Sequence, residues 1–242
     1  MSLNTNIKIA GQVLHLLMKE IENILKEGIT ENDINSFAEE CINEYGLGCR
    51  LASKGYEGFP ASLCVSTNDE IVHGVPSNRI LKNGDLVKVD IVIEYNGWYA
   101  DSAKTFIIGK GTKINKELVR VTKECLYKAI KIVKPGTTVG DIGYVVQQHA
   151  EKNGFSVMKR FGGHGIGTKI HQEPFIPCFG NKKEGFVLKE GMYICIEPML
   201  FMGKEDIIMD SKGYNVKSKD GLLTAHFEHT ILITKNSPLI LT

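Results

Sequence analysis

Two ten-residue stretches, Leu81–Asp90 (LKNGDLVKVD) and Leu188–Glu197 (LKEGMYICIE), resemble one another. Each begins Leu-Lys-x-Gly, continues as a strand-like run and reaches an acid six residues after the glycine, at a constant offset of 107 residues. A turn and a second candidate strand follow each stretch and carry a further acid, Asp101 in the first copy and Glu228 in the second. Self-similarity at a fixed offset predicts a duplicated unit folded about a pseudo-twofold axis.

Two helices are expected before each copy of the repeat. Apolar residues recur at helical spacing, and a threonine followed three residues later by an aspartate is a helix-start signal before the second helix of each pair. The expected helices are Ile7–Lys26, Thr30–Tyr45, Asn115–Val133 and Thr138–Gly154.

Short apolar or alternating runs between the helices predict strands. The expected strands are Ser62–Ser66, Asp85–Tyr95, Gly97–Ile108, Tyr193–Met199 and Leu222–Thr234. Asn96-Gly97 between two of these runs is the strongest hairpin signal in the chain. No linker, charge block or low-complexity segment divides the sequence, so we expect one α+β domain over residues 1–242, built of duplicated α-α-β-β halves.

The composition excludes several classes of protein. The 242 residues include 29 Lys and Arg against 28 Asp and Glu, a net charge of +1, which leaves no cationic surplus for a dedicated or sequence-specific nucleic-acid binder. No apolar run reaches the roughly 18 residues that a membrane span needs, and the N-terminus lacks a signal-peptide pattern. Six scattered cysteines without a CxxC pair predict reduced, mostly buried thiols. We expect a cytoplasmic protein.

The four acids of the repeat indicate a metal site. Asp90 and Glu197 lie in apolar runs, where a carboxylate is costly unless it is paired, protonated or bound to a metal. If the halves close on each other, Asp90, Asp101, Glu197 and Glu228 converge and repel, and cations are the usual remedy. A lysine partner would explain any one of these acids alone. Four acids at symmetric positions favour metal.

A glycine-rich segment contributes an imidazole. His164 lies among four glycines in residues 161–174, which predicts an extended, closely approached backbone rather than a helix. The glycine spacing is not the dinucleotide pattern and the segment is not HExxH. His171 could serve the same pocket, and His73 precedes a glycine at a turn. The other histidines are expected to be packing or helix-surface residues: His15, His149, His226 and His229.

Four carboxylates and one imidazole form a hard, oxygen-rich donor set. Such a set suits two divalent ions better than a thiolate zinc site does. Mn, Fe, Co and Zn all accept it, so the sequence leaves the identity of the ions open. Paired cations bridged by carboxylates are typical of two-metal hydrolases.

Taken together, six stretches resemble the methionine aminopeptidases of the pita-bread (creatinase/aminopeptidase) fold. They occur in the family's order along nearly the whole chain: Val65–Pro76, Val89-Asp90, Gly97–Asp101, Gly162–Gly167, Ile196–Met199 and Phe227–Thr230. The resemblance implies a central curved, mainly antiparallel sheet. It also implies removal of the N-terminal initiator methionine from nascent proteins when the second residue is small and uncharged, through a metal-bridging hydroxide.

The resemblance assigns roles to individual residues. The dinuclear metal ligands would be Asp90, Asp101, His164, Glu197 and Glu228. Asp101 and Glu228 would bridge the two ions, and Glu197 would also exchange protons with the nucleophilic water. His171 would steady the scissile carbonyl or its oxyanion, and His73 would hydrogen-bond the substrate amide nitrogen.

The methionine pocket and subtype follow from the same resemblance. The substrate-binding residues, besides His73 and His171, would be Tyr56, Phe59, Cys64, Ile170 and Tyr214. The pocket region departs from residues common in the family at Ser53, Glu57, Ile170 and Tyr214, which leaves the tolerated second residue open. Only a short segment separates His171 from the second acid strand, so the chain resembles a compact, bacterial-style type I enzyme, expected to be a monomer.

Two other functions remain open, a proline-directed exopeptidase and a non-catalytic peptide-binding module on the same fold. With the four acids committed to metal, the remaining chain has 29 basic and 24 acidic residues. This mildly basic remainder could favour transient contact with the RNA-rich ribosome, where nascent chains emerge.

Overall fold

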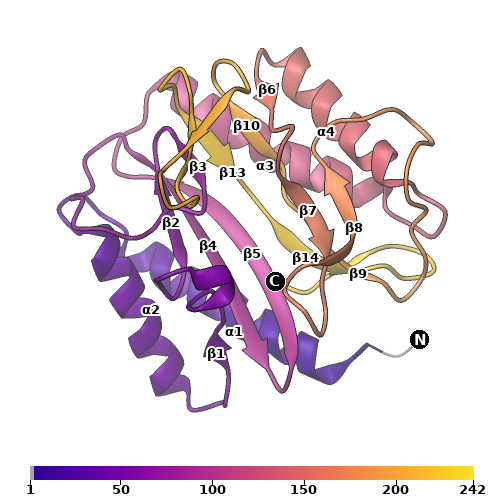
Figure 1. The fold of residues 1–242 in the computed structure, drawn as a ribbon, viewed down its shortest axis with the longest axis horizontal. Helices are drawn as coiled ribbons and strands as arrows, with labels where there is room; N and C mark the ends of the chain where they lie inside the picture. Colours follow the sequence, from indigo (N-terminus) through magenta and orange to yellow (C-terminus); the bar gives the residue numbers. More distant parts are fainter. Residues whose placement is uncertain (1–2) are drawn as a thin grey trace.

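A computed structural model describes residues 3–242 as two similar halves (Figure 1). The elements of the first half are α1 (Thr5–Ile24), α2 (Glu31–Tyr45), β1 (Arg50–Leu51), the 3₁₀ turn Tyr56–Gly58, β2 (Cys64–Thr67), β3 (Glu70–Val72), β4 (Leu86–Tyr95) and β5 (Trp98–Ile107). The elements that follow are α3 (Lys113–Ile132), α4 (Val139–Lys152), β6 (Ser156–Val157), β7 (Gly162–Gly165), β8 (Gln172–Pro177), β9 (Tyr193–Ile196), β10 (Met199–Phe201), β11 (Ile207–Met209), β12 (Val216–Ser218), β13 (Thr224–His226), β14 (His229–Leu232) and β15 (Leu239–Ile240).

The strands lie between the two helix pairs. In Figure 1, α1 and α2 occupy the lower left and α3 and α4 the upper right. Within residues 3–242 the strands form four sheets, in the orders β1-β4-β2 with β5 beside β4, β13-β10-β6, β11-β12-β3, and β15-β14-β9-β7-β8. Their pairings are antiparallel, as expected.

Both second helices begin with the predicted threonine. The Thr30 hydroxyl accepts the Asp33 N–H at 3.1 Å, and the Asp33 carboxylate accepts the Thr30 N–H at 2.7 Å. Thr138 and Asp141 form the same reciprocal pair. These bonds satisfy N–H groups that the first turn of a helix leaves unpaired. All four predicted helices are confirmed, with ends shifted by at most two residues.

The predicted duplication extends to individual hydrogen bonds. The Gly28 N–H donates to the Leu81 carbonyl at 3.0 Å, and the equivalent Gly136 N–H donates to the Leu188 carbonyl at 2.9 Å. Both glycines have a positive φ, 94° and 93°, which side-chain-bearing residues rarely adopt. In each half, the turn between the two helices is therefore bonded to the first residue of the repeated stretch, which confirms the α-α-β-β repeat.

Each half builds most of one hydrophobic core, and a few residues of the first half, such as Leu86, join the core of the second. In the first, Leu17 and Ile21 of α1 pack with Val89 and Ile91 of β4. In the second, apolar residues of α3 and α4 pack beneath β9, β10 and β13. The four carboxylates come from strands and strand ends where the two halves meet.

The second half differs from the prediction in its strands. Tyr193–Met199 and Leu222–Thr234 were each expected to be one strand, and each is wrong, because the structure has two strands in place of one. Pro198, which has no N–H to donate, separates β9 from β10 directly after Glu197. Phe227 and Glu228 separate β13 from β14. The strands β4 and β5 are continuous and meet at the predicted Asn96-Gly97 hairpin, with Tyr95 opposite Trp98.

Two composition-based expectations can be compared with the structure. All six cysteines are free, and five of them are buried. In residues 3–242, no helix combines the length and the apolar character needed to cross a membrane.

Hydroxyl-mediated bonds join the two halves at β5. The Thr230 hydroxyl donates to the Asp101 carbonyl at 2.8 Å and accepts the Asp101 N–H at 2.9 Å. The Ser102 hydroxyl donates to the Glu228 carbonyl at 2.7 Å, and the Glu228 N–H donates to the Ala103 carbonyl at 2.8 Å. These contacts fix the backbones of two predicted ligands, Asp101 and Glu228, against each other.

Replacing Thr230 by valine should test this junction. The near-isosteric Thr230→Val change leaves a buried N–H and a buried carbonyl of Asp101 without their partner, so we expect a loss of about 2–4 kcal/mol of unfolding free energy in urea. Thr122→Val is the matched control, because the buried Thr122 hydroxyl bonds only to the Leu118 carbonyl within α3. Equal losses in the two variants would contradict the role of the junction.

Candidate metal centre

Four buried side chains bring their donor atoms together at the junction. One donor atom from each of Asp101, His164, Cys195 and Glu228 lies within 4.8 Å of the others. Asp101 is supplied by β5, His164 by β7, Cys195 by β9 and Glu228 by the break between β13 and β14. Three of the five predicted metal ligands thus lie in one cluster, contributed by strands from both halves.

The other two predicted ligands lie at the edge of this cluster. Glu197 places Oε1 3.9 Å from Nε2 of His164, and the same nitrogen lies 3.8 Å from Oδ2 of Asp101. Asp90 lies on β4, which pairs with β5 so that Val92, two residues after Asp90, is opposite Asp101. Asp90 and Asp101 line the same cavity. The structure therefore brings all five predicted side chains to one region.

The buried carboxyl groups perturb one another. Burial, reinforced by neighbouring carboxylates, raises the pKa of Asp101 and of Glu228 well above the usual range. Burial also raises the pKa of Asp90. For Glu197 burial acts in the same direction, but the adjacent imidazoles of His226 and His164 outweigh it and lower the pKa. All four carboxyl groups can be ionised together only if additional positive charge is present.

Unpartnered oxygens show that the donor set fits divalent cations. Oδ1 of Asp101 and Oε1 of Glu228 are buried and have no hydrogen-bond partner among the described residues. Unpaired buried carboxylate oxygens are expensive unless they bind a cation or a proton. Carboxylate oxygens with one imidazole nitrogen are donors that Mn, Fe, Co and Zn accept.

Close packing of the backbone on both sides of His164 fixes the position of its imidazole. A Cβ on Gly163 would lie 2.2 Å from the Cys195 carbonyl oxygen, and one on Gly165 would lie 2.2 Å from the Glu173 carbonyl oxygen. His164 Nδ1 lies 3.0 Å from the Gly165 carbonyl, which favours the tautomer with its proton on Nδ1 and leaves Nε2 facing the carboxylates. The extended, closely approached backbone expected for this segment is confirmed.

A small cavity lies next to the carboxylates. Its volume is about 110 Å³, and its lining includes all five predicted methionine-pocket residues, Tyr56, Phe59, Cys64, Ile170 and Tyr214. The rings of Phe59 and Tyr214 meet edge to face, with centroids 5.5 Å apart. Ser53 and Glu57, two of the noted departures, also line the cavity.

The two histidines predicted to be catalytic flank this cavity. The Tyr56 hydroxyl lies 2.9 Å from Nδ1 of His171, whose ring meets the ring of His164 edge to face at 4.3 Å. Partial burial, together with His164, lowers the pKa of His171 to about 4, so its imidazole is neutral at pH 7. His73 has a positive φ of 59°, and its ring packs edge to face on Phe161.

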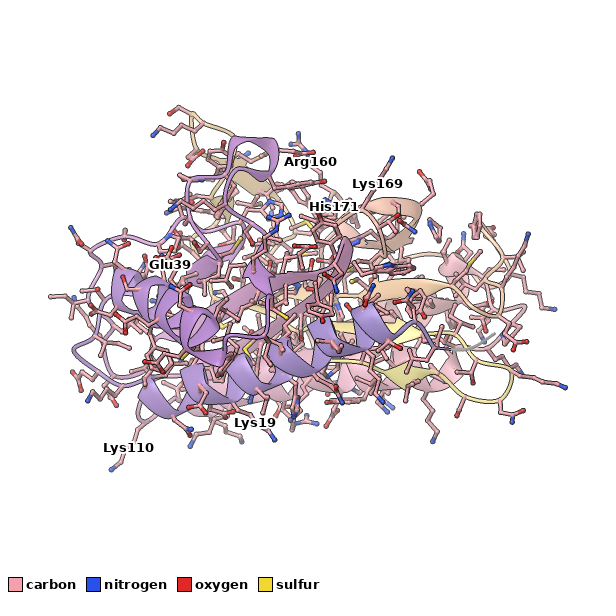
Figure 2. The ribbon with its side chains drawn as sticks, turned by 90° about the horizontal axis from the view of Figure 1, so that it is seen from below. Lys19, Glu39, Lys110, Arg160, Lys169 and His171 are labelled. Carbon is pink, nitrogen blue, oxygen red and sulfur yellow. The ribbon has the colours of Figure 1, made fainter. Side chains whose placement is uncertain are left out.

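Figure 2 shows which side of the molecule carries the site. His171 lies toward the same edge as Lys169 and Arg160, whereas Lys19 and Lys110 project from the opposite edge. Since Lys19 belongs to α1, His171 lies on the side of the molecule away from the part of this helix that carries Lys19.

Two residues of the site were missed from the sequence. Cys195 was expected only to be a buried thiol, and it lies within the donor cluster. His226 was expected to be a packing or surface residue without a constellation, and this is wrong, since its Nε2 lies 3.4 Å from Oε2 of Glu197. The sequence did contain a signal for both residues. Cys195 and His226 each precede a predicted ligand by two residues, the spacing that places side chains on one face of a strand.

The remaining histidines do not belong to the donor cluster. His15 is exposed on α1, and His149 of α4 lies 2.8 Å from Glu124 of α3. His229 contacts the hydroxyls of Tyr127 and Thr242. These positions agree with the packing and helix-surface roles expected for them.

Comparison with known proteins identifies the family. Residues 5–235 match metallopeptidase family M24. The chain belongs to metallopeptidase family M24. A methionine aminopeptidase of Mycoplasma capricolum is 44% identical over 98% of this chain and 94% of its own length. One from Aquifex aeolicus is 43% identical over 97% of this chain and 92% of its own length.

Solved M24 structures agree with the fold. The crystal structure of a methionine aminopeptidase from Thermotoga maritima superimposes with a TM-score of 0.96 at 39% identity, covering 100% of this chain and 98% of that one. A prolidase from Pyrococcus furiosus has a TM-score of 0.79 at 23% identity, covering 98% of this chain and 62% of that one. The second likeness shows only the shared pita-bread fold, which confirms the fold predicted from the sequence.

The glycine packing around His164 leads to a prediction. A methyl group at Gly163 meets backbone, which cannot move cheaply, so Gly163→Ala should lower the unfolding free energy by about 1–3 kcal/mol and weaken metal binding. Gly167→Ala is the control, because its Cβ would meet nothing closer than 3.5 Å. Urea unfolding and calorimetric titration with Mn²⁺ measure both effects. Wild-type behaviour of Gly163→Ala would show that the close approach does not hold His164.

Proposed function

We propose that this protein is a metal-dependent aminopeptidase that removes the initiator methionine from nascent proteins when the second residue is small and uncharged. The observation that carries the proposal is a cluster of buried metal-type donors next to an aromatic- and thiol-lined cavity of about 110 Å³. The near-full-length relatives that are named methionine aminopeptidases support the same activity.

The proposed metal ligands are Asp90, Asp101, His164, Glu197 and Glu228. These five donors would suit two divalent ions, Co, Mn, Fe or Zn, and Asp101 and Glu228 would be the ligands common to both. When bound, such ions act as Lewis acids toward a carbonyl oxygen and acidify water. The raised pKa values of Asp101 and Glu228 mean that protons compete with the ions, so metal binding should release protons and weaken as the pH falls.

The chain's own residues would orient the peptide and move protons. A neutral His171 can donate a hydrogen bond toward the scissile carbonyl or its oxyanion, while Tyr56 at 2.9 Å holds the other side of its ring. His73, which also lines the cavity, would bond the substrate amide nitrogen. Glu197, flanked by imidazoles, would accept a proton from water and pass it to the leaving amine.

The cavity composition supports methionine as the removed residue. Aromatic edges from Phe59 and Tyr214 and the buried Cys64 thiol offer polarisable contacts to a thioether. The cavity is small, which favours one unbranched side chain over a bulky ring. Glu57 at the cavity wall would disfavour an acidic residue close to the cleavage site.

Release of free methionine from synthetic peptides tests this function. Metal-loaded protein should cleave Met-Ala-Ser and Met-Gly peptides and leave Xaa-Pro peptides intact. Turnover of Xaa-Pro peptides alone would support the proline-directed exopeptidase. Peptide affinity that survives chelation, with no turnover in any of the four metals, would support the binding module instead.

Loss of the His171 imidazole should impair turnover more than binding. His171→Ala removes a donor to the developing oxyanion, so we expect kcat for Met-Ala-Ser to fall by the equivalent of about 2–4 kcal/mol. Metal affinity, measured by calorimetry, should change much less. His15→Ala, an exposed histidine on α1, is the control. An unchanged kcat in His171→Ala would reject this role.

Removing the shared charge of Asp101 should prevent loading of two ions. Asp101→Asn keeps the shape of the side chain but removes an anion that both ions would share. The metal content after repletion should therefore be lower than two ions per chain. Inductively coupled plasma mass spectrometry measures it, and Glu20→Gln on the exposed face of α1 is the control. Full loading of Asp101→Asn would refute the bridging role.

We further propose that residues 1–242 form a single catalytic domain that acts as a monomer in the cytoplasm. Arg160 and Lys169 lie on the His171 side of the molecule, which supports transient, electrostatic contact with ribosomal RNA during methionine removal (Figure 2). Co-sedimentation with ribosomes should therefore weaken as salt rises. Salt-insensitive or absent co-sedimentation would count against the contact.

A further inference from the structure

His226 is a buried imidazole that neither core nor proposed ligand set uses. Only 1% of the residue is exposed, and neither ring nitrogen has a hydrogen-bond partner within residues 3–242. Buried polar atoms are nearly always paired, so two unpaired nitrogens in one side chain require an explanation. The nearest charged group is the Glu197 carboxylate, whose Oε2 lies 3.4 Å from Nε2 of His226.

The backbone of His226 is held in place from two directions. Its N–H donates to the Thr105 hydroxyl at 2.9 Å, and the same hydroxyl donates to the His226 carbonyl at 2.7 Å. On its other side, His226 pairs with Met199 at the start of β10, two residues after Glu197. The imidazole is therefore presented to Glu197 by a fixed backbone from the opposite strand.

The chemistry of a neutral imidazole selects the direction of the bond. One ring nitrogen carries a proton and the other carries a lone pair. A lone pair on Nε2 would face the Glu197 carboxylate and repel it, and it would leave a buried N–H on Nδ1 without an acceptor. A proton on Nε2 removes both penalties, and the 3.4 Å separation exceeds an ordinary N–H···O bond by only a few tenths of an ångström.

We propose that His226 is a positioning residue that donates its Nε2–H to Glu197 and fixes the rotation of this carboxylate. Glu197 then lies between two imidazoles, with Oε2 toward His226 and Oε1 toward His164. The role of Glu197 as a metal ligand rests on the proposed function. Holding Oε2 leaves Oε1 to face the centre, so His226 would raise the affinity of the site for its ions.

His226 acts through Glu197 and is not itself a ligand in this proposal. Its nitrogens are not among the donor atoms of the cluster formed by Asp101, His164, Cys195 and Glu228. Groups that hydrogen-bond a ligating carboxylate orient it, and their removal typically reduces metal affinity or activity by about 10–100-fold.

Metal binding by three variants tests this role. His226→Leu keeps an apolar volume and removes the donor, His226→Gln keeps a side-chain N–H, and His149→Leu removes an imidazole from another His–Glu pair, at 2.8 Å, on α3 and α4. Metal-free proteins are titrated with Co²⁺ by calorimetry and visible absorption, and circular dichroism checks the fold. Release of methionine from Met-Ala-Ser is measured at saturating Co²⁺.

We expect Co²⁺ affinity to fall about 10–100-fold in His226→Leu and to return to within about threefold of wild type in His226→Gln. His149→Leu should bind like wild type. In His226→Leu, kcat at saturating metal should fall with KM little changed.

Wild-type affinity in His226→Leu, or a loss in His226→Gln as large as in His226→Leu, would overturn the proposal. A change of the Co²⁺ absorption bands in His226→Gln would do so as well, because it would indicate a lost ligand. If the wild type binds Co²⁺ with the expected dependence on His226 but releases no methionine, the proposed function fails and the positioning role stands.

Discussion

The hydroxyl bonds between β5 and the β13–β14 segment are the contacts on which the site depends. Thr230 bonds both the N–H and the carbonyl of Asp101, Ser102 bonds the carbonyl of Glu228, and Thr105 bonds both main-chain groups of His226. A single hydroxyl can both donate and accept, so it joins two backbones without requiring a continuous sheet. The two halves thus meet where the acids face one another.

This arrangement concentrates negative charge in a low-dielectric region. Asp101 is 5% exposed and Glu228 is 2% exposed, and each has an oxygen without a hydrogen-bond partner in the described part of the chain. Folding alone does not relieve that cost, whereas cations would relieve it directly. The flanking imidazoles of His164 and His226 reduce it at Glu197, and the tight glycine backbone of β7 allows one of them to approach. The packed strands therefore hold the carboxylates together in spite of the electrostatic free energy that their burial costs.

Local sequence signals predicted most of the helices and the β4–β5 hairpin, and they predicted the metal centre in part. The Thr30 and Thr138 helix starts and the Asn96-Gly97 hairpin follow from bonds between residues a few positions apart, which is why the sequence reveals them. The break at Glu228 was not predicted because no glycine or proline marks it, whereas the break after Glu197 coincides with Pro198, a local signal that the predicted strand ignored. His226 was overlooked because its partner, Glu197, is distant in sequence and lies just after a different strand, β9.

From the sequence alone came the repeat, the identities of the donor residues and the family they resemble, because residue type and spacing are properties of the chain itself. The tertiary structure decided which atoms meet. It placed Cys195 among the donors, left oxygens of Asp101 and Glu228 unpaired, and turned His226 toward Glu197. Such outcomes depend on distances between residues far apart in the chain, set by how two cores and their connecting hydroxyls fit together. The spacing of Cys195 and His226 two residues before an acid indicates only a shared face, not which atoms meet.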